Sequence, residues 1–90
     1  MTFRVKIRKE GIKELKKMPK ANLNRFLELK EVLQYEAVPR DRFDIAKLKG
    51  SDDLDIYRVS LGEYRIIYSV NWEERVILIH RLKRRGEAYK

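Results

Sequence analysis

Arginine and lysine side chains are the groups in this sequence whose types and spacing could do chemistry. A compact basic run occupies positions 83–85, and two further arginines, Arg58 and Arg65, flank a Gly-Glu pair in a segment rich in β-branched and aromatic residues. The planar guanidinium group suits phosphate, which it often binds through two hydrogen bonds. These residues therefore indicate a phosphate-binding site.

The Gly-Glu pair predicts how the two arginines lie relative to each other. A two-residue hairpin turn at positions 62–63 fixes the cross-strand partners. Partners point to the same side of a sheet, so Arg58 and Arg65 should be diagonal neighbours on the face that the helices leave uncovered. The predicted pairs are Leu61 with Tyr64, Ser60 with Arg65, Val59 with Ile66, and Arg58 with Ile67.

Two like charges at this separation repel, and a bound anion would relieve the repulsion. The alternative is that each arginine pairs with a nearby carboxylate, such as Asp55 or Glu63. We favour phosphate binding, because stability alone does not favour adjacent arginines.

Most other catalytic chemistries lack the residues that they need. The chain has no cysteine and one histidine, His80, which lies inside an apolar strand and is expected to be a packed or hydrogen-bonded residue rather than a catalyst. Asp52, Asp53 and Asp55 lie in or beside a predicted turn, so we expect neither a metal site nor a cofactor. The remaining chemistry is metal-free cleavage of RNA, in which the 2′-hydroxyl group attacks and basic side chains stabilise the phosphorane.

The charge distribution supports a polyanionic partner. The formal net charge is +8 over 90 residues, and the two ends of the chain are basic while the middle is not. The alternative is that the N-terminal lysines only solubilise a small domain. No apolar run approaches the roughly 20 residues of a membrane-spanning helix, and no signal peptide is evident, so we expect a cytoplasmic protein without a membrane partner.

Periodicity predicts one α+β domain over residues 1–90. The expected order is β-α-α-β-β-β, with an antiparallel sheet packed against an N-terminal helical hairpin. The nearly continuous apolar segment 76–82 is expected to be a central strand buried on both faces. The expected strands are 2–8, 54–61, 64–70 and 76–82, with a further short strand at 45–49 and helices ending near Pro19 and spanning 20–36.

Several segments together resemble the RelE/ParE toxin superfamily, and most resemble its archaeal RelE branch. The similarity extends over essentially the whole chain, and its most specific segment is Gly-x-Tyr-Arg-x-x-Tyr at 62–68. The resemblance implies a RelE-like fold and a toxin that enters the ribosomal decoding site and cleaves mRNA without a metal ion. It also implies a RelB-like antitoxin as partner, and no small-molecule ligand. The matching segments are Leu48-Lys49-Gly50, Tyr57-Arg58-Val59, residues 62–68, and the basic run followed by Tyr89.

The resemblance also implies roles for individual residues. Arg65 holds the place of the family's phosphate-stabilising arginine, and Tyr89 that of a tyrosine associated with base stacking or catalysis. Ser60 departs from the pattern, because some ribosome-dependent members carry a second lysine there. The implied catalytic set is Arg58, Arg65, Lys83, Arg85 and Tyr89, and the implied RNA-binding set is Lys47, Lys49, Arg81 and Arg84.

Two other functions remain open from the sequence. A ParE-like protein would inhibit a topoisomerase and cleave nothing, and a non-catalytic RNA-binding protein would bind without cleavage. We favour the nuclease, because members of the ParE branch tend to lack the basic and tyrosine set that this chain keeps.

Overall fold

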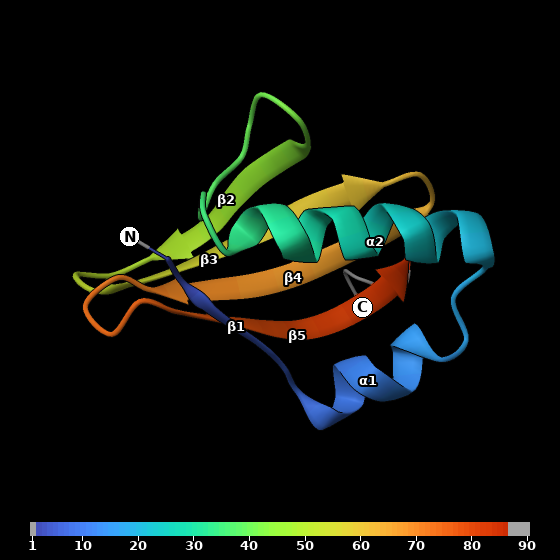
Figure 1. Cartoon of the computed structure of the whole chain (residues 1–90), viewed down its shortest axis with the longest axis horizontal. Helices are drawn as coiled ribbons and strands as arrows, with labels where there is room; N and C mark the ends of the chain where they lie inside the picture. The colour runs from blue at the N-terminus through green and yellow to red at the C-terminus, as the bar shows by residue number, and fades with distance from the viewer. Residues whose placement is uncertain (1, 87–90) are drawn as a thin grey trace.

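The computed structural model describes residues 2–86, which form two helices and a five-stranded sheet (Figure 1). The α+β class and the positions of its elements follow the sequence prediction. The segment expected at 45–49 is a full edge strand, which makes the sheet five-stranded. The elements are β1 (Arg4–Ile7), α1 (Lys9–Leu15), α2 (Lys20–Leu33), β2 (Asp44–Gly50), β3 (Leu54–Leu61), β4 (Tyr64–Asn71) and β5 (Val76–Arg84).

The sheet is mixed rather than purely antiparallel. Its strand order is β1-β5-β4-β3-β2; the consecutive strands from β2 to β5 are antiparallel, whereas β1 pairs with β5 in parallel. Short turns between strands impose antiparallel pairing, but the long connection through two helices places no such constraint on β1. The alternating pattern of β1 is the same for either direction, so the sequence could not decide this point.

The hydrophobic core lies between α2 and one face of the sheet. In Figure 1, α2 crosses the front of the sheet, while α1 lies beside β5. Phe26, Leu29 and Leu33 of α2 are fully buried. The opposite side of the core consists of sheet residues that are also fully buried, among them Val59, Ile66, Tyr68, Val70, Ile77 and Ile79.

The β3–β4 hairpin has the predicted register. Leu61 faces Tyr64, Ser60 faces Arg65, and Arg58 faces Ile67. Gly62 has a φ of +58°, as the first central residue of a type II′ turn requires. The face of the sheet that α2 does not cover is called the open face below. It carries Ile56, Arg58, Ser60, Arg65, Ile67, Ser69, Leu78, Arg81 and Lys83.

A β-bulge in β5 decides which of its side chains reach the open face. Tyr68 pairs with Ile79 and Ile67 pairs with Arg81, so His80 is an extra residue between the two pairs. Ile79 and Leu82 are therefore both buried, although they are three positions apart. The prediction that 76–82 is buried on both faces is wrong, because only alternate residues of β5 are buried and those of the open face are partly exposed.

Candidate nucleic-acid interface

Arg65 and Lys83 lie directly opposite each other on neighbouring strands of the open face. Opposite residues of an antiparallel pair have Cβ atoms about 5 Å apart. Arg58 lies diagonally from Arg65 on β3, as the sequence predicted, and all three side chains are partly exposed. The partly buried Ile67 lies between Arg58 and Arg81 in the register. The fold thus places these cationic side chains around the partly buried side chain of Ile67.

Hydrogen bonds to the hairpin turn fix the guanidinium group of Arg65. Its Nη1 atom donates to the carbonyl oxygens of Gly62 at 2.9 Å and of Tyr64 at 3.1 Å. The carboxylates considered as alternative partners bind other residues, since Glu63 contacts Arg84 at 3.5 Å and Asp55 contacts Lys47 and Trp72. Within residues 2–86, neither carboxylate is paired with Arg65.

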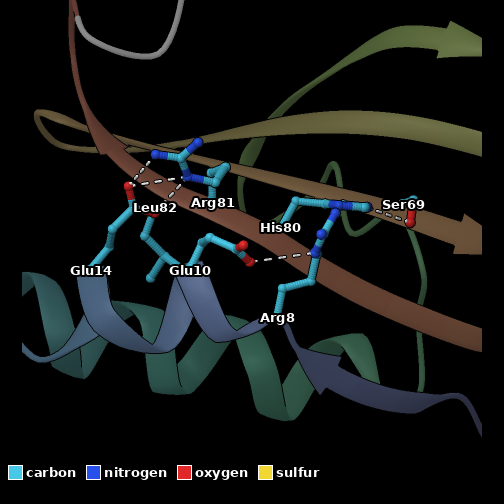
Figure 2. Close-up of polar contacts among 7 residues, drawn as sticks. All are labelled: Arg8, Glu10, Glu14, Ser69, His80, Arg81 and Leu82. Atoms are coloured by element: carbon cyan, nitrogen blue, oxygen red, sulfur yellow. Dashed lines mark hydrogen bonds and ion pairs between the residues drawn. The ribbon is translucent and has the colours of Figure 1, made fainter.

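Glu14 of α1 is a residue of this site that the sequence analysis missed. Its carboxylate lies 3.1 Å from Nζ of Lys83 and accepts hydrogen bonds from Nε and Nη2 of Arg81 at 2.9–3.2 Å (Figure 2). It also accepts the backbone N–H of Leu82 at 2.8 Å. Pairing between β1 and β5 ends at Ile7 and Ile79, so this N–H lies beyond the reach of β1 and Glu14 replaces a strand partner.

The environment of Glu14 favours its ionised form. Partial burial opposes ionisation, but the hydrogen bonds from Arg81, Leu82 and Lys83 outweigh it and hold the pKa of Glu14 below its usual 4.5. Glu14 is one of only two carboxylates among the first 20 residues, which also hold eight basic side chains. This scarcity of acidic residues was the only feature of the sequence that could have singled out Glu14. The partners of Glu14 are more than 60 positions away in the sequence, so they could not be predicted from it.

Other predicted site residues do not join this cluster. Arg84 is paired with Tyr64, so it belongs to the helix-covered side of the sheet, where it is exposed. Lys47 is paired with Tyr57 on that same side and contacts Asp55 at 3.3 Å.

Three further predicted residues lie at or beyond the margins of the open face. Lys49 is opposite Ile56, at the outer edge of the open face. Arg85 follows β5 and is exposed, with its backbone N–H bonded to the carbonyl oxygen of Glu63. Tyr89 lies outside the described residues.

The buried tyrosines are structural rather than acid–base groups. Tyr57 and Tyr68 stack on the helix-covered side, and the Tyr68 hydroxyl donates to the carbonyl oxygen of Ala37 at 2.8 Å. Burial raises the pKa of both phenols above the usual value. Neither phenol can reach a substrate on the open face.

Residues 2–86 offer neither a metal site nor a membrane-spanning helix. No group of three or more His, Asp or Glu side chains in this part of the chain could hold a metal ion. Neither α1 nor α2 is long and apolar enough to cross a membrane.

Comparisons with known proteins agree with the observed fold. A sequence profile described as the ParE toxin of the type II toxin–antitoxin system parDE matches residues 5–89. A Methanocaldococcus jannaschii protein that carries the name RelE1 is 46% identical over 90 residues, covering 100% of this chain and 98% of its own.

Solved structures give the same result. The archaeal RelE–RelB complex from Pyrococcus horikoshii contains a chain that is 57% identical, with a TM-score of 0.90, covering 96% of this chain and 98% of its own. The RelB–RelE complex from Methanococcus jannaschii matches at 29% identity with a TM-score of 0.75, covering 92% and 93%. These matches define a toxin of a type II toxin–antitoxin system. The chain belongs to the RelE/ParE family, on its archaeal RelE side, as the sequence motifs predicted.

Proposed function

We propose that this toxin is a ribosome-dependent endonuclease that cleaves mRNA without a metal ion. The observation that carries the proposal is the direct opposition of Arg65 and Lys83 on the open face, with Arg58 on the diagonal. RNA brings its own nucleophile, the 2′-hydroxyl group. A site that aligns this group with the phosphate and stabilises the charge of the phosphorane accelerates cleavage by positioning and electrostatics.

Within this proposal the residues have different roles. Arg65, held at the turn by two carbonyl oxygens, stabilises the reacting phosphate, and Lys83 contacts the same phosphate from β5. Arg58 binds a neighbouring phosphate. Arg85 and Tyr89 keep the roles that the family resemblance implies, and Lys49 and Arg81 extend the basic surface for RNA.

The ribosome is required because the part of the site within residues 2–86 lacks an evident strong base. The phenols of Tyr57 and Tyr68 lie on the wrong side of the sheet, and the single histidine is bonded to Ser69. Such a site depends on a partner that aligns the RNA. The ribosomal decoding site, where mRNA is held in a defined path, supplies that alignment.

A RelB-type antitoxin is the proposed protein partner. Structurally similar RelE chains have been crystallised with RelB. The present chain carries a net charge of +8 and exposes the apolar side chains Leu48, Leu54 and Trp72, so an acidic, amphipathic segment would suit it. Binding should block the nuclease, and a complex that retained full activity would count against this.

A cell-free translation assay with toeprinting tests the nuclease. Wild-type protein should cut mRNA on the ribosome, and Arg65→Ala should slow cleavage by about 10²-fold, the usual loss for one transition-state contact. Lys20→Ala, which removes one exposed charge from α2 on the opposite side, is the matched control. Equal cleavage by wild type and Arg65→Ala would refute the proposal.

The second candidate function is inhibition of a topoisomerase without cleavage. It is favoured by the family profile, which is described as a ParE toxin. A supercoiling assay distinguishes the candidates, because a ParE-like protein inhibits a topoisomerase while mRNA stays intact. Toeprints that show ribosome binding without cleavage would instead support a non-catalytic RNA-binding protein.

A further inference from the structure

A second basic pocket lies beside the proposed nuclease site, where β1 ends, α1 begins and β5 bulges. Its volume is about 280 Å³, and it is lined by Arg8, Glu10, His80 and Arg81. These side chains come from α1, β5 and the residue between β1 and α1. Figure 2 shows Arg8 and Glu10 joined by an ion pair, with His80 turned towards Ser69 and the guanidinium group of Arg81 turned towards Glu14. The two residues proposed above to contact the reacting phosphate, Arg65 and Lys83, do not line this pocket.

The fold holds His80 in a fixed orientation in this pocket. Its Nε2 atom is 2.9 Å from the hydroxyl oxygen of Ser69, and Ser69 is the one buried polar residue of the described chain, at 6% exposure. His80 is also the extra residue of the β-bulge, so it lies beside Arg81 rather than opposite a residue of β4. The bulge thus places two consecutive polar residues, His80 and Arg81, at this pocket.

Both guanidinium groups of the pocket keep the capacity to bind a further anion. Glu14 binds Nε and Nη2 of Arg81, which leaves Nη1 outside that ion pair. Arg8 contacts Glu10 through Nε at 3.6 Å, and both side chains are about half exposed. An exposed pair of this kind is weak, so a phosphate can compete for Arg8.

The pocket continues the basic surface of the proposed site. Arg65 is on β4, Lys83 and Arg81 are on β5, and Arg8 follows β1, on the far side of β5. Neighbouring strands are about 4.8 Å apart, so the cations extend over roughly 10 Å across the strands. Arg4 and Lys6, both exposed on β1, add to the positive field.

We propose that the pocket formed by Arg8, His80 and Arg81 binds a backbone phosphate of a single-stranded polynucleotide that also passes Arg65 and Lys83. The inference rests on the proposed function only for the identity of that polymer as RNA. The bound phosphate fixes the strand at a point away from the reacting group. It takes the place of Glu10 on Arg8 and accepts from Nη1 of Arg81.

His80 reports on occupancy of the pocket. Partial burial, followed by the charge of Arg8, holds the pKa of His80 below its usual 6.5. The other groups around the ring are Glu10, Arg81 and the Ser69 hydroxyl. A bound phosphate would offset the charge of Arg8, so it would raise the pKa of His80.

Proton NMR tests the proposal directly, because His80 is the only histidine of the chain. The ligands are a hexanucleotide with 2′-O-methyl groups, which cannot supply the attacking hydroxyl, and inorganic phosphate. The hexanucleotide should shift the His80 ring signals to saturation and raise the pKa of His80. If the ring signals do not move, or if inorganic phosphate binds as tightly as the hexanucleotide, the assignment to a polynucleotide phosphate is wrong.

Two variants that each remove one positive charge distinguish binding at the pocket from general electrostatic attraction to a basic surface. Arg8→Gln should weaken hexanucleotide binding about tenfold and reduce the salt slope by about 0.7. Lys6→Gln removes one charge from the exposed side of β1 outside the pocket, and it should cost distinctly less. Equal losses for the two variants would overturn the proposal. Native amide spectra of both variants exclude misfolding as the cause.

The result of the His80 titration can be interpreted independently of the cleavage assay. Loss of cleavage by Arg65→Ala without a His80 response would refute the pocket alone. A His80 response without ribosomal cleavage would leave the pocket in place and refute the nuclease.

Discussion

The carboxylate of Glu14 lies 3.1 Å from the ammonium group of Lys83, across the seam between α1 and β5. The same carboxylate binds Arg81 and the backbone N–H of Leu82. One acidic side chain therefore fastens the first helix to the strand that carries the basic site. Stability and activity should both depend on Glu14.

Replacement of Glu14 should lower stability in a pH-dependent way. The pKa of Glu14 is depressed in the folded state, so its contribution is present above its usual 4.5 and is lost as the pH falls through the folded value. Glu14→Gln should cost about 1–3 kcal/mol of unfolding free energy at pH 7, because hydrogen bonds to a charged group are lost. Urea unfolding at pH 7 and at progressively lower pH measures this, and the difference from wild type should shrink in acid. Glu31→Gln, an exposed change on α2, is the control.

Glu14 should also act as a positioning residue for Lys83. Glu14→Gln should reduce single-turnover cleavage on the ribosome by ten- to a hundredfold, roughly the effect of a misplaced catalytic group. Glu14→Asp, which keeps the charge, should recover part of the rate. If Glu14→Gln cleaves at the wild-type rate while it is fully folded, Lys83 does not need this support.

The hairpin that carries Arg65 should depend on the backbone of Gly62. A residue other than glycine at a φ of +58° is strained, so Gly62→Ala should destabilise the fold by roughly 1–2 kcal/mol. Gly62→Asn should cost less, because asparagine tolerates this conformation. Urea unfolding of the two variants checks the order. An alanine variant as stable as wild type would show that the turn can relax.

The Tyr68 hydroxyl should matter for stability but not for cleavage. Tyr68→Phe leaves the carbonyl oxygen of Ala37 without its 2.8 Å hydrogen bond, which should cost about 1–3 kcal/mol. The hydroxyl lies on the helix-covered side, so the cleavage rate per folded molecule should not change. Thermal unfolding and a toeprinting time course measure the two effects. A slower cleavage rate at a temperature where the variant is folded would place Tyr68 in the mechanism.

The sequence alone determined the local parts of this protein. A Gly-Glu turn between two alternating segments fixed the β3–β4 register, and with it the diagonal of Arg58 and Arg65. Turn chemistry and a period of two act over a few residues, so they can be read directly from the chain. The motifs around this hairpin also pointed to the toxin family to which the chain belongs.

Only the tertiary structure decided how the remaining charges are used. The extra residue His80 in β5 resets the alternation of side chains, so Lys83 reaches the open face and Arg84 the opposite one. A bulge depends on how a strand pairs with its neighbour, and no residue of the apolar run 76–82 indicates it from the sequence. The link from Glu14 to Lys83 joins residues far apart in the sequence. It forms because β1 ends at Ile7, and α1 lies against the part of β5 that β1 does not pair with. The parallel pairing of β1 with β5 was likewise decided by tertiary structure, because it depends on packing between chain segments far apart in the sequence.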